Sequence, residues 1–302
     1  MPELPEVEAT RRSIAGPLKG RRIRAVALGK VLRWPLGCDP ADLVGARLGA
    51  AQRRGKYIWL PLEDTQVAQD GRLHTRGGLL VHLGMSGALS LLEPRPDWPE
   101  GDLAAVQRER GPHVHVALWH DAGVLLYTDP RRFGAWLWSP GLDAPPASTR
   151  LAGLGHEPWD EALTPQRLRA LWQGKSVAVK SALLSGQAIV GAGNIYACEA
   201  LFRARIHPAT PCGQLTLAQC TRLLFEVRGV LQQALDLGGT TLRNYSDALG
   251  QTGEFQFATT VYGREGLPCR VCARPVQRFV QQQRSTFFCA HCQKPYKPKV
   301  PR

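Results

Sequence analysis

Two Cys-x-x-Cys pairs near the end of this 302-residue chain place the strongest constraint on its fold. Cys269 and Cys272 form the first pair, and Cys289 and Cys292 follow after sixteen intervening residues. This spacing is typical of zinc ribbons, in which each pair lies on a tight turn and four thiolates close a tetrahedral structural site. We therefore expect one structural Zn²⁺ here; two reduced, metal-free pairs are the alternative.

The segment around these cysteines is too small to fold without help. About forty residues bury too little apolar surface for independent stability, so bound metal has to supply folding energy. His291 lies between the last two cysteines and is a competing ligand, although Cys292 fits the spacing better. Once folded, the segment presents Arg284 and Lys294 on a rigid basic surface.

Much of the positive charge is concentrated in the same segment. The chain has a net charge of +13, and residues 262–302 contain nine Lys or Arg against one acid, Glu265, a net of +8. A surplus this concentrated favours a polyanionic partner, most commonly nucleic acid. The alternative, a basic surface that only keeps the protein in solution, predicts a more even spread.

The first half of the chain contains short β-rich segments bounded by Gly, Pro or Asp. This pattern predicts an antiparallel sandwich or barrel after an N-terminal helix that begins near Pro5. The polar stretches 64–78 and 93–112 are expected to be surface loops. The predicted strands are residues 23–28, 56–62, 79–83, 113–119, 124–128 and 135–138.

The second half has helical periodicity. Thr164-Pro165 begins one helix, and Thr216 begins a longer one that Gly238-Gly239 ends. Residues 238–257 form a Gly- and Thr-rich segment, long for a simple connection and therefore functional or disordered. A chain of this length exceeds one hydrophobic core. We expect an N-terminal domain at 1–139, a linker at 140–150, a helical domain at 151–260 and a zinc finger at 261–302.

No apolar run approaches the ~18 residues needed to span a bilayer. The first residues are acidic and lack the apolar core of a signal peptide. We therefore expect a cytosolic protein whose cysteines stay reduced.

The chain begins MPELPEVE. Removal of Met1 leaves the Pro2 nitrogen as a free secondary amine, and an α-amine has a pKa near ~8, so part of it is nucleophilic at neutral pH. Attack on a sugar C1′ gives an iminium ion, while neighbouring carboxylates can protonate the ring oxygen. The alternative is that Pro2 merely precedes a helix whose dipole favours the three glutamates. Spacing alone favours that alternative.

Seven ordered segments, together with the cysteine spacing, resemble the formamidopyrimidine-DNA glycosylase family. The resemblance implies an α+β multidomain protein with an N-terminal β-sandwich, a helix–two-turns–helix domain and a zinc finger, with DNA bound between the lobes. The segments are PELPEVE (2–8), RRGKY (53–57), HLGMSG (82–87), DPRRFG (129–134), GAGNIY (191–196), VYGR (261–264) and RSTF (284–287).

The resemblance also implies catalytic roles. Pro2 matches the Schiff-base nucleophile, and Glu3 matches the proton donor to the sugar. Lys56 matches the proton donor of β-elimination. Arg284 matches the zinc-finger arginine linked to δ-elimination and to the phosphates beside the lesion. Glu6 matches a supporting carboxylate near the nucleophile; a structural role at the helix N-terminus is the alternative.

Such enzymes swing the damaged nucleotide out of the stack and fill the gap. The family's wedge residues match Met85, Arg131 and Phe133. For the isolated histidines a structural role remains open. Phosphate contacts are expected at Lys56, His82, His113, Lys175, Lys180, Asn194, Tyr262 and Arg284.

Residues 238–257 correspond to the segment that caps the extruded base in the purine-specific branch of the family. The resemblance therefore implies a bifunctional glycosylase and abasic-site lyase of base excision repair. It would remove 8-oxoguanine and formamidopyrimidines from double-stranded DNA by β,δ-elimination, as a monomer in the bacterial cytosol or nucleoid. The alternatives are a glycosylase of the same family for oxidised pyrimidines and a non-catalytic zinc-finger DNA-binding protein.

Overall fold

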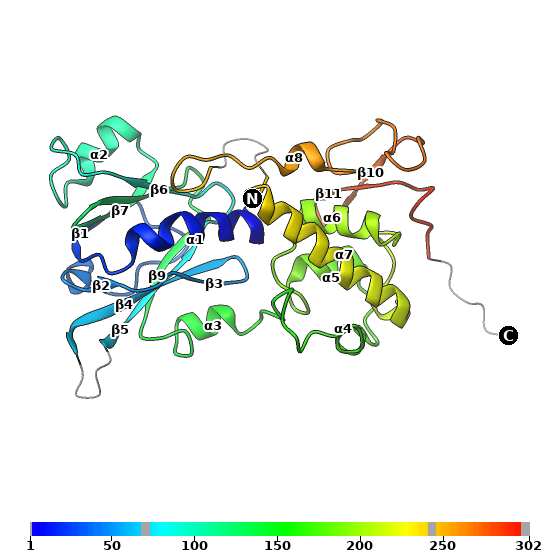
Figure 1. The fold of residues 1–302 in the computed structure, drawn as a ribbon, viewed down its shortest axis with the longest axis horizontal. Helices are drawn as coiled ribbons and strands as arrows, with labels where there is room; N and C mark the ends of the chain where they lie inside the picture. Colours follow the sequence, from blue (N-terminus) through cyan, green and yellow to red (C-terminus); the bar gives the residue numbers. More distant parts are fainter. Residues whose placement is uncertain (1, 68–72, 241–245, 297–302) are drawn as a thin grey trace. The chain divides into compact units, whose positions relative to one another are not determined.

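The computed structural model contains two compact units, whose elements are drawn in Figure 1. Each unit has its own hydrophobic core. The structure describes residues 2–67, 73–240 and 246–296. The first unit comprises residues 1–152 and 238–253, and the second comprises the rest of the chain. Within the described ranges, no helix combines the length and the apolar character needed to cross a bilayer.

Two antiparallel sheets form the sandwich of the first unit. Leu60 and Val81 of one sheet share a buried core with Leu118 and Leu125 of the other. Trp59, next to Leu60, belongs to a different cluster, because successive side chains of a strand point to opposite faces of the sheet. One sheet has the order β1 (Ile23–Leu28), β7 (Val114–His120), β8 (Gly123–Thr128) and β6 (Ala88–Leu92); the other has β2 (Arg47–Leu48), β4 (Tyr57–Val67), β5 (Leu73–His82) and β9 (Ala135–Ser139), with β3 (Gln52–Arg54) also paired to β4.

Helix α1 (Leu4–Leu18) adds one apolar face to this core. Val7, Ile14 and Leu18 are almost fully buried in it. Because these residues recur at helical spacing, they lie on one face of the helix and anchor it along its length. The N-terminal end of the helix is thereby held in place. The 3₁₀ turn η1 (Pro40–Leu43) buries Leu43 in the same core.

Residues 93–112 are not a surface loop, as their composition led us to expect, because they contain helix α2 (Leu103–Arg110). The Asp102 carboxylate caps this helix by accepting the Ala105 N–H at 3.0 Å. Val106 is fully buried in a cluster with Trp98 and residues of β7. This second cluster explains why every residue of β7 is buried.

The loop expectation for residues 64–78 was also wrong, and the predicted linker contains regular structure. Most of the stretch 64–78 extends the β4–β5 hairpin, with Val67 paired to Leu73. The expected linker 140–150 ends in helix α3 (Ala147–Leu151), because the Ser139 hydroxyl donates to the Ala144 carbonyl at 3.0 Å and accepts the Ala147 N–H at 3.2 Å.

Helices build the second unit. The longest, α7 (Leu217–Asp236), has Thr216 as its N-cap in a capping box with Gln219 and buries an apolar stripe that includes Leu223 and Val227. Trp172 and Leu168 of α4 lie in the same core. The helical elements are α4 (Pro165–Trp172), α5 (Val179–Ser185), α6 (Asn194–Arg203), η2 (Cys212–Gln214), α7 (Leu217–Asp236) and α8 (Phe255–Ala258).

A two-stranded hairpin, β10 (Gln277–Gln281) and β11 (Arg284–Phe288), completes the second unit. Its two turn residues, Gln282 and Gln283, have φ of +48° and +58°. A two-residue turn with both φ values positive matches the twist of a hairpin. Arg284 follows directly, so its backbone position is set by this turn.

Candidate functional site

The N-terminal end of α1 brings the predicted nucleophile and two acids together. Pro2 is partly buried and directly precedes Glu3, which caps the helix. Glu3 and Glu6 form a reciprocal capping box in which the Glu3 N–H donates to Glu6 Oε2 at 2.7 Å. Both acids are only 2% exposed. The contacts that start the helix also fix the side chains of two acids that follow Pro2 closely in the sequence, so their structural role is compatible with the predicted chemical one.

Glu6 also holds the segment 238–253. Its Oε1 accepts the Thr240 N–H at 2.7 Å, so both oxygens of one carboxylate accept backbone N–H groups. Gly239 has a φ of +89°, and a Cβ there would lie 3.0 Å from Glu6 Oε1. A glycine is thus required where the chain passes over this carboxylate.

The same segment is attached to the first unit farther along. The Ala248 N–H donates to Ser13 Oγ at 3.2 Å, and the Ala248 carbonyl accepts the Leu91 N–H at 2.8 Å. Residues 238–253 therefore belong with the sandwich, which corrects our assignment of the whole loop 238–257 to the helical domain. Residues 241–245 of that loop lie outside the described part of the chain.

Lys56 lies in the turn directly before β4, and His82 is the last residue of the neighbouring strand β5. Lys56 is partly buried in the turn between β3 and β4, and Tyr57 pairs with His82, with ring centroids 4.7 Å apart. Burial, together with the nearby charges of Lys56 and Arg33, lowers the pKa of His82 from its ordinary value of 6.5 to about 4. The Gly84 N–H donates to His82 Nδ1 at 3.1 Å, which leaves the proton of the neutral ring on Nε2. His82 can thus donate a hydrogen bond to a phosphate but does not bring a charge.

The three predicted wedge residues lie on two neighbouring turns of the first unit. Met85 is 38% exposed and Phe133 is 46% exposed. The Arg131 guanidinium carbon lies 4.7 Å from the centre of the Phe133 ring. A Cβ on Gly84 would collide with the backbone of Gly134, so the two turns are in direct contact. His113, one of the predicted phosphate contacts, is exposed at the start of β7.

Lys180 does not lie where the sequence placed it. It was expected to contact phosphate, yet its side chain is 0% exposed. Its Nζ donates to Thr286 Oγ1 at 2.8 Å and to the Ser285 carbonyl at 3.1 Å. Asn194 Nδ2 donates to the same Ser285 carbonyl at 2.9 Å. Both side chains therefore fix the backbone next to Arg284, and a buried ammonium needs such hydrogen bonds.

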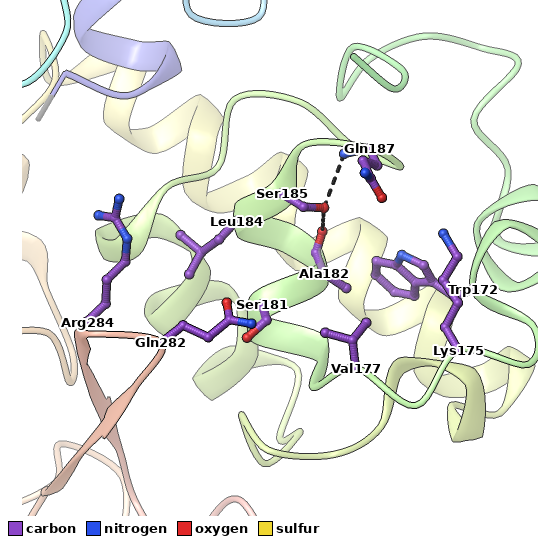
Figure 2. Close-up of a pocket in the computed structure, with 10 residues that line it drawn as sticks. All are labelled: Trp172, Lys175, Val177, Ser181, Ala182, Leu184, Ser185, Gln187, Gln282 and Arg284. Carbon is purple, nitrogen blue, oxygen red and sulfur yellow. Dashed lines mark hydrogen bonds between the residues drawn. The ribbon is translucent and has the colours of Figure 1, made fainter. Parts of the chain in front are cut away.

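Lys175 and Arg284 remain exposed and line one pocket of the second unit. The pocket has a volume of about 330 Å³. Figure 2 shows the two cationic side chains on opposite sides of it. The structure thus brings together two of the predicted phosphate contacts. The other lining residues are Trp172, Val177, Ser181, Ala182, Leu184, Ser185, Gln187 and Gln282.

Glu199 of α6 is an important buried acid that the sequence analysis missed. It is 0% exposed, and its Oε1 accepts the N–H groups of Val261 at 2.9 Å and of Tyr262 at 2.8 Å. Its Oε2 accepts both the N–H and the hydroxyl of Thr260. Glu199 therefore positions Tyr262, a predicted phosphate contact. The sequence did contain a signal for this role, namely an acid within an apolar helix face. A carboxylate buried there needs hydrogen-bond partners.

The four predicted cysteine ligands meet at one point. The sulfur atoms of Cys269, Cys272, Cys289 and Cys292 all lie within 4.8 Å of one another. Sulfur atoms of a tetrahedral zinc site with Zn–S bonds of about 2.3 Å are separated by about 3.8 Å, so the arrangement fits Zn²⁺. His291 is exposed and outside this group, so the competing ligand is excluded. Four thiolates make the site structural, with no position open for chemistry.

Family models match three segments of the chain in order. The formamidopyrimidine-DNA glycosylase N-terminal domain matches residues 1–136, and the H2TH domain of the same glycosylases matches residues 154–246. The zinc finger found in FPG and IleRS matches residues 266–295.

Similar proteins match over almost the full length. The chain is 45% identical over 294 residues to a formamidopyrimidine-DNA glycosylase of Acidovorax sp., and 47% identical over 301 residues to one of Cupriavidus pinatubonensis. Each match covers 97% of this chain and 100% of the relative.

Solved structures agree with these matches. The MutM (FPG) protein of Thermus thermophilus has a TM-score of 0.80 and 36% identity, covering 98% of this chain and 100% of that one. The complex between Lactococcus lactis Fpg and abasic-site DNA has a TM-score of 0.79 and 28% identity, covering 97% of this chain and 100% of that one.

Proposed function

Because the chain belongs to the formamidopyrimidine-DNA glycosylase family, we infer that it is a base excision repair enzyme that removes oxidised purines from DNA and cleaves the resulting abasic site. Its substrates are formamidopyrimidines and 8-oxoguanine in double-stranded DNA. One Zn²⁺ held by the four cysteines stabilises the hairpin that carries Arg284.

The chemistry follows from a free amine at Pro2. Its nitrogen forms a bond to C1′ while the bond from C1′ to the base breaks, and the base leaves with the bonding electrons and takes up a proton. Glu3 protonates the ring oxygen, so the sugar opens to an iminium ion at C1′. Solvent water then takes a proton from C2′, and the electrons of that C–H bond form a C2′–C3′ double bond as the bond from C3′ to the 3′ phosphate oxygen breaks. Lys56 donates a proton to the departing phosphate oxygen. A second elimination, supported by Arg284, expels the 5′ phosphate.

The observation that carries this proposal is the capping box beside Pro2. Glu3 is buried and held within the first turn of α1, so its carboxylate stays next to the nucleophile. Glu6 ties this end of the helix to Thr240, at the start of the segment that we propose caps the extruded base.

Each unit contributes proposed contacts to DNA. In the second unit, the exposed Lys175 and Arg284 share one pocket and provide two cationic contacts. In the first unit, Lys56 and the neutral His82 provide further contacts. If about six phosphates are neutralised, the logarithm of the binding constant falls with the logarithm of salt concentration at a slope near −5.

We also propose that the protein acts as a monomer in the bacterial cytosol or nucleoid. One chain supplies the nucleophile, the acids, the wedge residues and the zinc ligands, so the chemistry requires no second copy. Size-exclusion chromatography with light scattering tests this, and a dimer that persists on a lesion duplex would contradict it.

Borohydride trapping tests the enzymatic proposal. The protein is mixed with an 8-oxoguanine:C duplex and reduced, and a covalent protein–DNA adduct is expected because borohydride reduces the iminium ion. A duplex with an oxidised pyrimidine is the comparison, and an undamaged duplex is the control. Tight binding to the lesion duplex without any adduct would identify a binder instead.

A further inference from the structure

We propose that Asp129 is a positioning residue, which holds Met85, Arg131 and Phe133 in the geometry required to enter the DNA stack. The proposal rests on the proposed function, because it concerns how that enzyme extrudes a damaged base. Asp129 itself is 0% exposed and does not reach DNA. Its effect is transmitted through the backbone of the two turns that carry the wedge residues.

Four hydrogen bonds converge on the Asp129 carboxylate. Oδ1 accepts the hydroxyl of Ser86 at 2.5 Å and the N–H of Arg131 at 3.3 Å. Oδ2 accepts the hydroxyl of Tyr127 at 3.2 Å and the N–H of Gly134 at 2.8 Å. Ser86 belongs to one turn, and Arg131 and Gly134 belong to the other. One buried carboxylate therefore links both turns, and all four donors are needed to satisfy it.

The backbone of the two turns leaves no room for an alternative packing. A Cβ on Gly134 or on Gly87 would collide with the Tyr127 hydroxyl. Gly84 has a φ of +68°, and a Cβ there would collide with the backbone of Gly134. The Tyr127 hydroxyl oxygen also lies 3.3 Å from the Leu83 carbonyl oxygen. The two turns behave as one rigid body centred on Asp129.

The side chains that project from this body are those of wedge residues. Met85 and Phe133 are large apolar groups left 38% and 46% exposed, and Arg131 stacks over Phe133. Side chains of this kind are inserted between base steps by proteins that kink DNA. Fixing their backbone in advance removes an ordering cost that would otherwise accompany insertion.

This placement predicts which step depends on Asp129. Extrusion of an intact damaged base requires the wedge to compensate for lost stacking. A preformed abasic site has no base to extrude, so its cleavage depends less on the wedge. The ratio of the two rates separates a positioning role from a general loss of structure, which would lower both.

The experiment compares Asp129→Asn and Ser86→Ala with wild type, using full-length zinc-loaded protein. Asp121→Asn is the matched control, because Asp121 is an exposed acid in the same unit. Single-turnover excision from an 8-oxoguanine:C duplex is expected to slow roughly 10- to 100-fold in both test variants, as small misplacements do. Cleavage of a preformed abasic site is expected to change less than about threefold. A 2-aminopurine next to the lesion reports extrusion directly, and its fluorescence rise is expected to slow by the same factor as excision.

Equal slowing on both substrates, or no slowing of excision, would overturn the proposal. If Asp129→Asn does not fold, Ser86→Ala decides the question, because it removes one donor and leaves the carboxylate in place. A wild-type protein that excises no oxidised purine would instead refute the proposed function, so the two failures are distinguishable.

Discussion

Glu6 and Thr240 are joined by a hydrogen bond of 2.7 Å although 234 residues separate them in the chain. The other oxygen of the same carboxylate accepts the Glu3 N–H at 2.7 Å. One side chain thus connects the end of the helix that carries the proposed nucleophile to the segment proposed to cap the base. Weakening this link should therefore affect catalysis.

Glu6→Gln is expected to slow excision of 8-oxoguanine roughly 10- to 100-fold, because the amide nitrogen of Gln faces an N–H donor and one of the two bonds is lost. Binding to a duplex with a stable abasic-site analogue is expected to stay within about threefold. Single-turnover kinetics and a fluorescence titration measure the two quantities. Glu100→Gln, an exposed acid of the same unit, is the control. An unchanged excision rate in Glu6→Gln would exclude the coupling.

An N-terminal tag that blocks the amine of Pro2 is expected to abolish excision and borohydride trapping and to leave DNA binding intact. The reason is that an amide nitrogen is not nucleophilic. The same tag at the C-terminus is the control. Mass spectrometry confirms which preparations have lost Met1, and full excision by a protein whose amine is blocked would contradict the mechanism.

Lys175→Met is expected to change DNA binding and Lys180→Met is expected to change stability. Lys175 is exposed, so its loss should reduce the salt slope of DNA binding by about one and leave the unfolding free energy unchanged. Lys180 is buried with hydrogen bonds to Ser285 and Thr286, so its loss should cost about 1–3 kcal/mol of unfolding free energy. Urea denaturation and salt titrations measure both. A lower salt slope in Lys180→Met together with unchanged stability would restore the phosphate-binding interpretation.

Removal of zinc is expected to release one metal ion per chain and to unfold the hairpin that carries Arg284. The sulfur geometry and the small size of this segment require the metal for folding. Elemental analysis before and after a chelator gives the stoichiometry, and proteolysis of the C-terminal segment reports its unfolding. A chelated protein that stays resistant to protease and binds lesion DNA as before would contradict this expectation.

The low pKa of His82 predicts a pH dependence of stability. Burial lowers this pKa from 6.5 to about 4, so between these values the unfolded chain binds a proton that the folded chain does not. The contribution is complete above about pH 6.5 and is lost as the pH falls toward 4, in total on the order of 3 kcal/mol. Urea midpoints of wild type and His82→Gln between pH 4 and pH 7 measure it. The variant should lose less stability on acidification, and parallel curves would contradict the assignment.

Features governed by local sequence were predictable. The spacing of the four cysteines specified the metal site, and short β-rich segments bounded by Gly, Pro or Asp located most strands of the sandwich. Thr216 and Gly238 marked the ends of α7 because capping depends on a few neighbouring residues. The acids near Pro2 were also identified, since their motif is continuous in the sequence.

Features that depend on distant partners were not predictable. Lys180 looks like any lysine of a basic surface, and only Thr286, 106 residues away, shows that it is buried. The role of Glu199 depends on its hydrogen bonds from residues 260–262. The role of Asp129 depends on its hydrogen bond from a turn some forty residues earlier. Helix α2 was missed because few of its residues are apolar, although those few fill a separate core.

The two ends of the segment from Gly239 to Gly253 meet at a narrow neck. A Cβ on Gly253 would collide with the Gly239 carbonyl, and just outside the neck the Glu254 N–H donates to the Leu237 carbonyl at 2.9 Å. The two ends are thus fastened to each other independently of what lies between them. The length and composition of the segment can therefore vary without opening this neck, provided that the contacts of Thr240 with Glu6 and of Ala248 with Ser13 are kept. Replacing this segment with the equivalent segment of another member of the glycosylase family is therefore a direct route to new lesion preferences.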